Sequence, residues 1–340
     1  MSTSLELQAV ADLLRERQSF LLIPHERADG DALGSVLALA RALQLHGKTA
    51  FPLALTEVSE RYRFLLEQAT LPVLGRDISI DRLPAADAVL ILDTGARQQL
   101  QSVLTFLDGP RPTLAVIDHH AYRDLACDRT FADDTTPATG ILVAELLTAL
   151  GWLDDAQTAA YLLLAIGADT GWFAYSNTTA DCFAWAHKLV RLGADSRALY
   201  EKLFLSDSVP RFRLLARALA STELRAKDRV VALTLRKSDF VACGADEAHT
   251  ENLIDQACRL KSMLVAALFV EQSETQTRVS LRSRDPFDVH RFAARFGGGG
   301  HRRAAGIKMA GPIDQVRSLI LAALEQEASA ASGSIAPCNS

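Results

Sequence analysis

Residues 111–120, RPTLAVIDHH, place an aspartate and two adjacent histidines at the end of an apolar run. A run of this length and composition is typical of a strand buried on both faces, as in a parallel sheet covered by helices. Ligands of such sheets bind at the carboxyl ends of the strands. Asp118, His119 and His120 are therefore predicted to lie at the edge of a sheet where a ligand binds.

Three further segments carry acids where an apolar segment ends. They are IPHERADGDALGS with His25, Asp29 and Asp31, LILDTG with Asp93, and AIGADTGWF with Asp169. An aspartate that emerges from an apolar run costs folding free energy unless it is paired or bound to a metal. A helix cap or a turn would explain any one of these acids. Four such segments, all expected at the same edge of a sheet, instead favour a common ligand.

The order of the elements predicts an α/β fold. Helices alternate with apolar strands in the first half, which indicates a mostly parallel sheet. A helical stretch then precedes a smaller α/β domain, in which we expect a strand over 228–240 and a helix near 247–260. The predicted organisation is a first domain over 1–190, a helical connector over 191–225, a second domain over 226–330 and a disordered tail over 331–340.

Composition limits the class of protein. The chain has 340 residues, 49% of them hydrophobic, which suits about two globular domains. No apolar run reaches the ~20 residues of a membrane span, and the N-terminus lacks the features of a signal peptide. The five cysteines form no CxxC pair, so we expect free thiols and a cytoplasmic location. A net charge of −5 argues against a protein that coats long nucleic acid, but it allows a small anionic substrate.

Carboxylates and imidazoles without thiolates favour hard or borderline divalent ions such as Mn²⁺ or Mg²⁺. Five or six ligands are too many for one catalytic ion with open positions. They suit two ions about 3.5–4 Å apart that share a bridging carboxylate. Such a pair lowers the pKa of a water and holds a phosphoryl group, which is the chemistry of phosphate ester or anhydride hydrolysis.

The motifs HxxxDGDxxGS, DTG, DHH and ADTG, in this order over residues 20–175, resemble the DHH phosphoesterase superfamily. FGGGGHRRAAG, residues 296–306, is similar to the GGGH signature of the DHH-associated C-terminal domain. The resemblance implies two divalent ions, with Mn²⁺ favoured and Mg²⁺ or Co²⁺ as alternatives. It implies a first ion held by His25, Asp29 and Asp93, and a second held by Asp31, Asp93, His119 and Asp169.

The resemblance also implies roles for residues beside the ions. Asp93 would bridge them, Asp118 would orient a ligand or hold His119 in its metal-binding tautomer, and His120 would donate to a phosphate oxygen. The second domain would bind the non-scissile part of a nucleotide, so that the active site lies in an interdomain cleft. Its expected contacts are Arg282, Ser283, Gly299, Gly300, His301 and Arg302.

Two positions depart from the pattern of the superfamily. Many relatives have Asn-Pro where this chain has Arg27-Ala28, and many have arginine where it has Ala174. No expected metal ligand is lost. The second departure removes one expected substrate contact and weakens any inference about substrate length. Trp172 and Phe173 follow Asp169 directly and could stack on a base or belong to the core.

We expect a two-metal phosphodiesterase that degrades very short RNA or DNA oligonucleotides, such as pApA, to mononucleotides. It could also remove the 3′-phosphate of 3′,5′-adenosine bisphosphate. The alternatives are a non-catalytic nucleotide-binding regulator and a phosphodiesterase specific for cyclic dinucleotides. The expected partners are therefore nucleotides and not a membrane, and the resemblance allows a homodimer. Neither the preferred substrate nor the polarity of degradation follows from the sequence.

Overall fold

The computed structural model describes residues 2–330, which form two compact units, a first up to Ser206 and a second from Asp207 onward. The predicted disordered tail over 331–340 lies outside the described residues. In the part of the chain that is described, no helix is long and apolar enough to cross a membrane.

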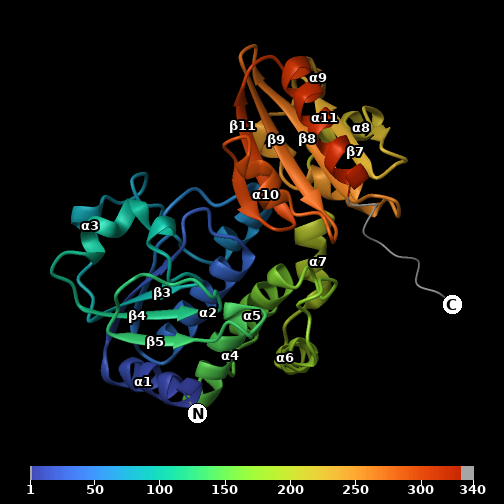
Figure 1. The fold of residues 1–340 in the computed structure, drawn as a ribbon. Helices are drawn as coiled ribbons and strands as arrows, with labels where there is room; N and C mark the ends of the chain where they lie inside the picture. Colours follow the sequence, from blue (N-terminus) through green and yellow to red (C-terminus); the bar gives the residue numbers. More distant parts are fainter. Residues whose placement is uncertain (1, 331–340) are drawn as a thin grey trace. The chain divides into compact units, whose positions relative to one another are not determined.

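The first unit contains a five-stranded sheet in the order β2-β1-β3-β4-β5, in which every pair of neighbours is parallel. Figure 1 shows β3, β4 and β5 of this sheet side by side. Its strands are β1 (Ser19–Pro24), β2 (Thr49–Pro52), β3 (Ala88–Leu92), β4 (Thr113–Asp118) and β5 (Arg129–Ala132). Its helices are α1 (Ser2–Glu16), α2 (Gly30–Leu45), α3 (Leu104–Leu107), α4 (Thr139–Leu150), α5 (Ala156–Asp169), α6 (Ala180–Arg191) and α7 (Ser196–Phe204). Parallel pairing throughout confirms the sheet predicted for this half.

Alternation along the strands separates two hydrophobic cores. Phe20 and Leu22 of β1 pack with residues of α1, α2, α4 and α5 on one face of the sheet. Leu21 and Ile23 pack on the other face with residues of α3 and its preceding turns. Because side chains on a strand alternate between faces, a strand buried on both sides is apolar throughout. This is why the strands read as unbroken apolar runs.

Helices α2 and α5 approach each other closely. A Cβ atom at Gly34 would lie 2.5 Å from the backbone oxygen of Tyr161, and one at Gly30 would lie 2.6 Å from Cβ of Ala168. Glycine at these two positions therefore lets the two helix backbones come together. The close approach brings the first turn of α2 beside Asp169, the last residue of α5.

The second unit is built on a six-stranded mixed sheet in the order β10-β11-β9-β8-β7-β6, in which only β7 and β8 are parallel. Its strands are β6 (Glu223–Arg225), β7 (Val230–Leu235), β8 (Val265–Ser273), β9 (Gln276–Ser283), β10 (Gly299–His301) and β11 (Ala304–Ala310). Its α-helices are α8 (Val209–Ala220), α9 (Lys237–Cys243), α10 (Val289–Ala294) and α11 (Ile313–Ala330). Residues of α8 and α9 pack on one face, and those of α10 and α11 pack on the other. The smaller α/β domain is thus confirmed.

Two predicted elements in this unit were wrong in detail. The helix expected near 247–260 is two 3₁₀ helices, Glu247–Thr250 and Leu253–Arg259, because Asn252 adopts a left-handed conformation with φ of 57°. The strand expected over 228–240 ends at Leu235. The last residues of the predicted segment instead belong to α9, and Asp239 caps this helix by accepting from the backbone N–H of Arg236.

The predicted connector over 191–225 contributes one helix to each unit. Helix α7 contacts α5 in the first unit, and α8 packs through Leu214 and Ala218 against the second sheet.

Candidate metal centre

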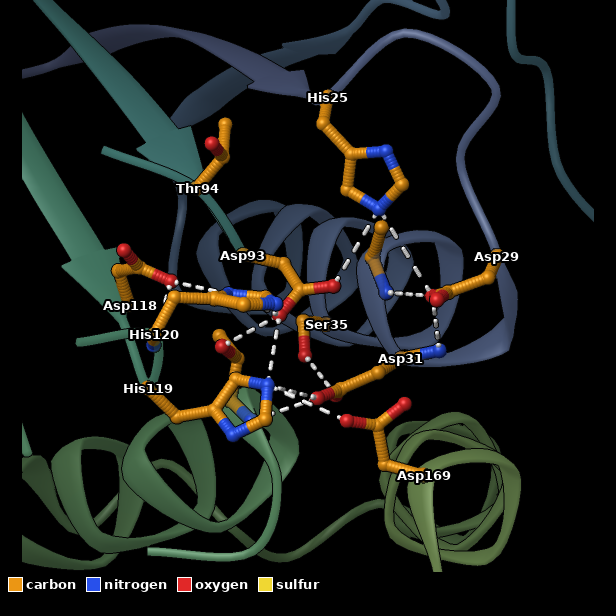
Figure 2. A network of polar contacts seen from close by, with 12 residues as sticks. His25, Asp29, Asp31, Ser35, Asp93, Thr94, Asp118, His119, His120 and Asp169 are labelled. Carbon is orange, nitrogen blue, oxygen red and sulfur yellow. Dashed lines mark hydrogen bonds and ion pairs between the residues drawn. The ribbon is translucent and has the colours of Figure 1, made fainter. Parts of the chain in front are cut away.

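The carboxyl edge of the first sheet gathers acids and histidines from three neighbouring strands (Figure 2). His25 follows β1, Asp93 follows β3, and Asp118 ends β4 directly before His119 and His120. Because β1, β3 and β4 are adjacent and parallel, their ends lie side by side. The prediction that these motifs share one edge of the sheet is confirmed.

Two helices complete the cluster. Asp29 caps the N-terminus of α2, where its Oδ1 accepts from the backbone N–H groups of Asp31 and Ala32. Asp31 lies in the first turn of the same helix and is fully buried. Asp169 approaches from the end of α5, and its Oδ2 lies 3.1 Å from Nε2 of His119.

Potential ligand atoms fall into groups in which all atoms lie within 4.8 Å of one another. The groups are His25, Asp29 and Asp93; Asp31, His119 and Asp169; and Asp93, His119 and His120. Asp93 belongs to two of them, and its Oδ2 lies 3.5 Å from His25 Nε2 while its Oδ1 lies 3.5 Å from His119 Nε2. All six residues predicted as ligands therefore lie together, and the role of each as a ligand stays a prediction.

The orientation of two imidazole rings fits a cation. Nδ1 of His25 lies 2.8 Å from the backbone oxygen of Glu26, and Nδ1 of His119 lies 3.1 Å from that of Thr136. A carbonyl can only accept, so Nδ1 carries the proton and Nε2 presents its lone pair. Both Nε2 atoms face carboxylates, and that of His119 is buried without a hydrogen bond in the described chain. A lone pair that faces a carboxylate is repulsive unless a proton or a metal ion lies between them.

The carboxylates around the two imidazole rings also shift the pKa values of these rings. Burial lowers the pKa of His25, but the hydrogen bonds and negative charges of Asp29 and Asp93 outweigh burial and raise it to about 11. Burial also lowers the pKa of His119, but Asp169 and Asp93 raise it to about 9. In the metal-free site both rings are therefore in the charged imidazolium form at neutral pH, with a second proton on Nε2.

Asp93 has an unusual backbone. Its φ is 65°, in the left-handed region that few residues other than glycine adopt, although aspartate and asparagine tolerate it better than most. This conformation accompanies the position of its carboxylate between His25 and His119. Burial raises the pKa of Asp93 to about 6, together with the charges of Asp29 and Asp169. A strained backbone that carries a buried acid is typical of a functional site.

Asp31 is held by the start of a distant helix. Its Oδ2 accepts from the backbone N–H of Thr139 at 2.6 Å, and its Oδ1 accepts from that of Gly140 at 2.8 Å. Both donors belong to the first turn of α4, whose N-terminus favours a negative charge. The hydroxyl of Ser35 also donates to Oδ1.

Thr139 was not predicted as part of the site. Its hydroxyl donates to Oδ1 of Asp93 at 2.8 Å, and its backbone N–H donates to Asp31, so one buried residue orients two predicted ligands. The only signal in the sequence is a threonine at the start of a helix that follows the DHH segment. Its separation of 108 residues from Asp31 hides the contact.

We expect Thr139→Val, which keeps the shape but removes the hydroxyl, to weaken binding of Mn²⁺ by roughly tenfold or more, as is usual for partners that orient metal ligands. Thr139→Ser keeps the hydroxyl and should bind Mn²⁺ like the unaltered protein. Calorimetric titration measures both. Equal affinity of the valine and serine variants would show that the hydroxyl does not orient Asp93.

Asp118 contacts His120 rather than His119. Oδ1 of Asp118 lies 2.8 Å from Nδ1 of His120 and accepts from its backbone N–H. The carbonyl of Thr136, and not Asp118, sets the tautomer of His119. The hydrogen bond to Asp118 raises the pKa of His120, whose side chain is 42% exposed. The ring of His120 is thus partly accessible beside the cluster.

The residues predicted as substrate contacts lie in the second unit, around β9, β10 and β11. Arg282 is paired with Asp255 at 2.9 Å, and the hydroxyl of buried Ser283 donates to the backbone oxygen of Phe287. His301 is exposed at the end of β10.

The glycines before His301 form part of a hairpin. Gly299 and Gly300 are paired with β11, and Gly300 has φ of 142°. A Cβ atom at Gly300 would lie 2.5 Å from the backbone oxygen of Ala304, so close backbone approach accounts for glycine there. Arg302 lies beyond the strand, with Nη2 at 3.4 Å from Asp285. The roles of these residues as substrate contacts stay predictions.

Trp172 and Phe173 pack within the first unit. Trp172 meets Tyr200 and Phe204, and Phe173 stacks on Phe183 with ring centroids 5.4 Å apart. Both rings are partly buried and pack against the margin of the first core, while their ring partners are partly exposed.

Comparison with known proteins identifies the two units. A family model described as the DHH family, N-terminal domain, matches residues 19–167, and one described as the DHHA1 domain matches residues 230–330. The chain is a DHH phosphoesterase. The matches confirm the predicted superfamily, its C-terminal domain and the prediction that the chain is a phosphoester hydrolase.

Several known proteins are similar to this DHH phosphoesterase over most of its length. It is 28% identical over 326 residues to a Thermus thermophilus protein named bifunctional oligoribonuclease and PAP phosphatase NrnA, with 95% of this chain and 94% of the relative covered. The crystal structure of an exopolyphosphatase-related protein from Bacteroides fragilis has a TM-score of 0.88 at 21% identity, covering 97% and 98% of the two chains. RecJ from Thermus thermophilus in complex with Mn²⁺ has a TM-score of 0.53 at 16% identity, covering 95% of this chain and 55% of RecJ.

Proposed function

We propose that this DHH phosphoesterase uses two divalent metal ions to hydrolyse very short oligonucleotides to mononucleotides, and that it also removes the 3′-phosphate of 3′,5′-adenosine bisphosphate. One observation carries the proposal, namely that buried Asp93 points one oxygen at His25 and the other at His119. A carboxylate shared by two groups of ligands is the arrangement that a two-metal centre needs.

His25, Asp29 and Asp93 would hold the first ion, and Asp31, Asp93, His119 and Asp169 the second. We propose Mn²⁺ because the donors are carboxylate oxygens and imidazole nitrogens, and because a RecJ protein with the same fold has been solved with Mn²⁺. When bound, such ions lower the pKa of a water molecule and neutralise negative charge on a phosphoryl group.

The residues of the chain would position the substrate and move protons. Asp118 accepts from Nδ1 of His120, which fixes the ring and leaves Nε2 free to donate to a phosphate oxygen. Thr139 and the first turn of α4 would hold Asp93 and Asp31 in place. Both acids are almost fully buried, which keeps water away from their carboxylates.

The name of a relative and the exposed residues of the second unit support the proposed substrate class. The Thermus thermophilus relative, which the chain covers almost completely, is named as an oligoribonuclease and PAP phosphatase. We propose that exposed His301 and Arg302, with Arg282, bind the non-scissile part of the nucleotide, where arginine can contact a phosphate through two N–H groups. A Cβ atom at Gly299 would meet nothing within 4 Å, so this glycine would leave room for that phosphate beside β10, while Gly300 would serve by closing the hairpin on β11.

Hydrolysis of a series of 5′-labelled RNAs of two to about ten residues, with MnCl₂, tests the proposed function. Assays on pApA, 3′,5′-adenosine bisphosphate and cyclic dinucleotides run beside it. We expect the highest kcat/KM on the shortest chains and release of inorganic phosphate from the bisphosphate. Folded, metal-loaded protein that binds nucleotides without hydrolysing them would instead indicate a regulator. Activity on cyclic dinucleotides alone would indicate a phosphodiesterase specific for them.

A further inference from the structure

Arg123 follows the DHH segment of the metal centre and has no acidic partner among the described residues. It is exposed and, among the described residues, forms no ion pair. Several other arginines of the first unit are neutralised, for example Arg97 by Asp108 and Arg111 by Asp128 at 2.7 Å each. An exposed arginine that keeps its charge free is available to bind an anion.

The side chain of Arg123 is nevertheless held in place. Its Nη1 donates to the backbone oxygen of His120, and its aliphatic part lies over Gly95. A Cβ atom at Gly95 would lie 2.5 Å from Cγ of Arg123, so the glycine of the DTG motif makes room for this side chain. Gly95 and Arg123 also form a parallel backbone bridge, and the oxygen of Gly95 accepts from the N–H of Leu125 at 2.9 Å.

The two segments that hold Arg123 are the ones that carry Asp93 and His120. Gly95 lies two residues after Asp93, and the guanidinium lies within hydrogen-bond reach of the backbone of His120. The ring of His120 is itself 3.9 Å from Oδ1 of Asp93. A guanidinium group has five N–H donors, and the bond to His120 uses one, which leaves donors for a ligand at this edge.

The sum of the charges at the proposed site leaves a phosphate group for Arg123 to neutralise. Two divalent ions would neutralise the carboxylates of the four predicted acidic ligands, Asp29, Asp31, Asp93 and Asp169. The negative charge of a phosphate group would then remain uncompensated by them. A planar guanidinium matches the oxygens of a phosphate and keeps its charge at any physiological pH.

We propose that Arg123 binds a non-bridging oxygen of the phosphate group that is cleaved. This inference rests on the proposed function, because it places the scissile phosphate beside His120 and the two ions. It assigns to the first unit a cationic contact with the substrate in addition to the expected contacts in the second. Since every substrate has a scissile phosphate, the contact would serve pApA and 3′,5′-adenosine bisphosphate alike.

Steady-state kinetics of Arg123→Ala and Arg123→Lys in full-length protein loaded with MnCl₂ test the inference. We expect Arg123→Ala to lower kcat/KM by roughly 10²-fold on both substrates, the usual cost of removing a donor to a developing charge. Arg123→Lys keeps the charge and should retain part of the lost activity. Arg129→Ala is the matched control, because Arg129 is also exposed but lies at the opposite end of the sheet, at the start of β5. Bound manganese should be unchanged in all three variants.

Three outcomes would overturn the inference. They are unchanged kinetics of Arg123→Ala, a loss confined to one of the two substrates, and a loss of bound manganese that accounts for the lost activity. Failure of the proposed function would look different, because the unaltered protein would then hydrolyse neither substrate.

Discussion

Asp93→Asn is expected to lower kcat/KM on a dinucleotide by about 10³-fold or more, because it removes the one carboxylate that both groups of ligands share. Asparagine is the informative replacement. It preserves the size of the side chain and tolerates the left-handed backbone at φ of 65° as aspartate does, whereas alanine would add strain. Bound manganese, measured by elemental analysis, should fall from two ions per chain to one or none.

Asp134→Asn is the matched control for this variant. Asp134 is exposed in the same unit, and its replacement by asparagine removes the same negative charge. The activity and manganese content of this variant should therefore equal those of the unaltered protein. Circular dichroism and the unfolding temperature establish that Asp93→Asn is folded. Wild-type turnover by folded Asp93→Asn would contradict the two-metal account.

Affinity for Mn²⁺ is expected to rise steeply with pH. In the metal-free protein the pKa values of His119 and His25 are raised to about 9 and about 11, so both rings are protonated at pH 6 to 8. An ion that binds Nε2 must displace that proton, and a rise in pH removes the competition. The dissociation constant at each site should therefore fall about tenfold per unit of pH in this range.

Titration calorimetry in two buffers with different ionisation enthalpies counts the protons released. We expect about one proton per ion from the two rings. Asp31 should add to the release at the second site, because burial and the charges of Asp93 and Asp169 raise its pKa well above the usual value. Asp93, with its pKa of about 6, should add to the release below pH 6. His290→Ala, which changes an exposed histidine of the second unit, should release the same number. Affinity that is independent of pH would mean that the two rings do not bind the ions.

The convergence of the predicted ligands could be anticipated because it follows from a parallel sheet. Once β1, β3 and β4 are recognised as neighbours, His25, Asp93 and the DHH segment must lie at one edge. Asp169 was expected at the same edge, but the order of the strands does not place it there, since it ends a helix rather than a strand. Its position depends on the close packing of α5 on α2, which Gly30 and Gly34 allow but do not reveal in the sequence.

The bond from Thr139 to Asp93 was beyond prediction because it joins segments 46 residues apart. The pairing of Asp118 with His120 is local, but the sequence does not show which of the two adjacent histidines Asp118 contacts. Nothing in the sequence singles out Arg123, because only the fold brings it over Gly95. In the second unit, the helix expected near 247–260 failed because one residue, Asn252, interrupts it with a left-handed backbone.

Anomalous diffraction near the manganese absorption edge, from crystals grown with MnCl₂, tests the central claim most directly. The account predicts two peaks about 3.5–4 Å apart. The carboxylate of Asp93 should bridge the two ions, either through a single oxygen or with one oxygen on each ion. His25 should bind one ion and His119 the other. A single peak, or two peaks that Asp93 does not bridge, would contradict it.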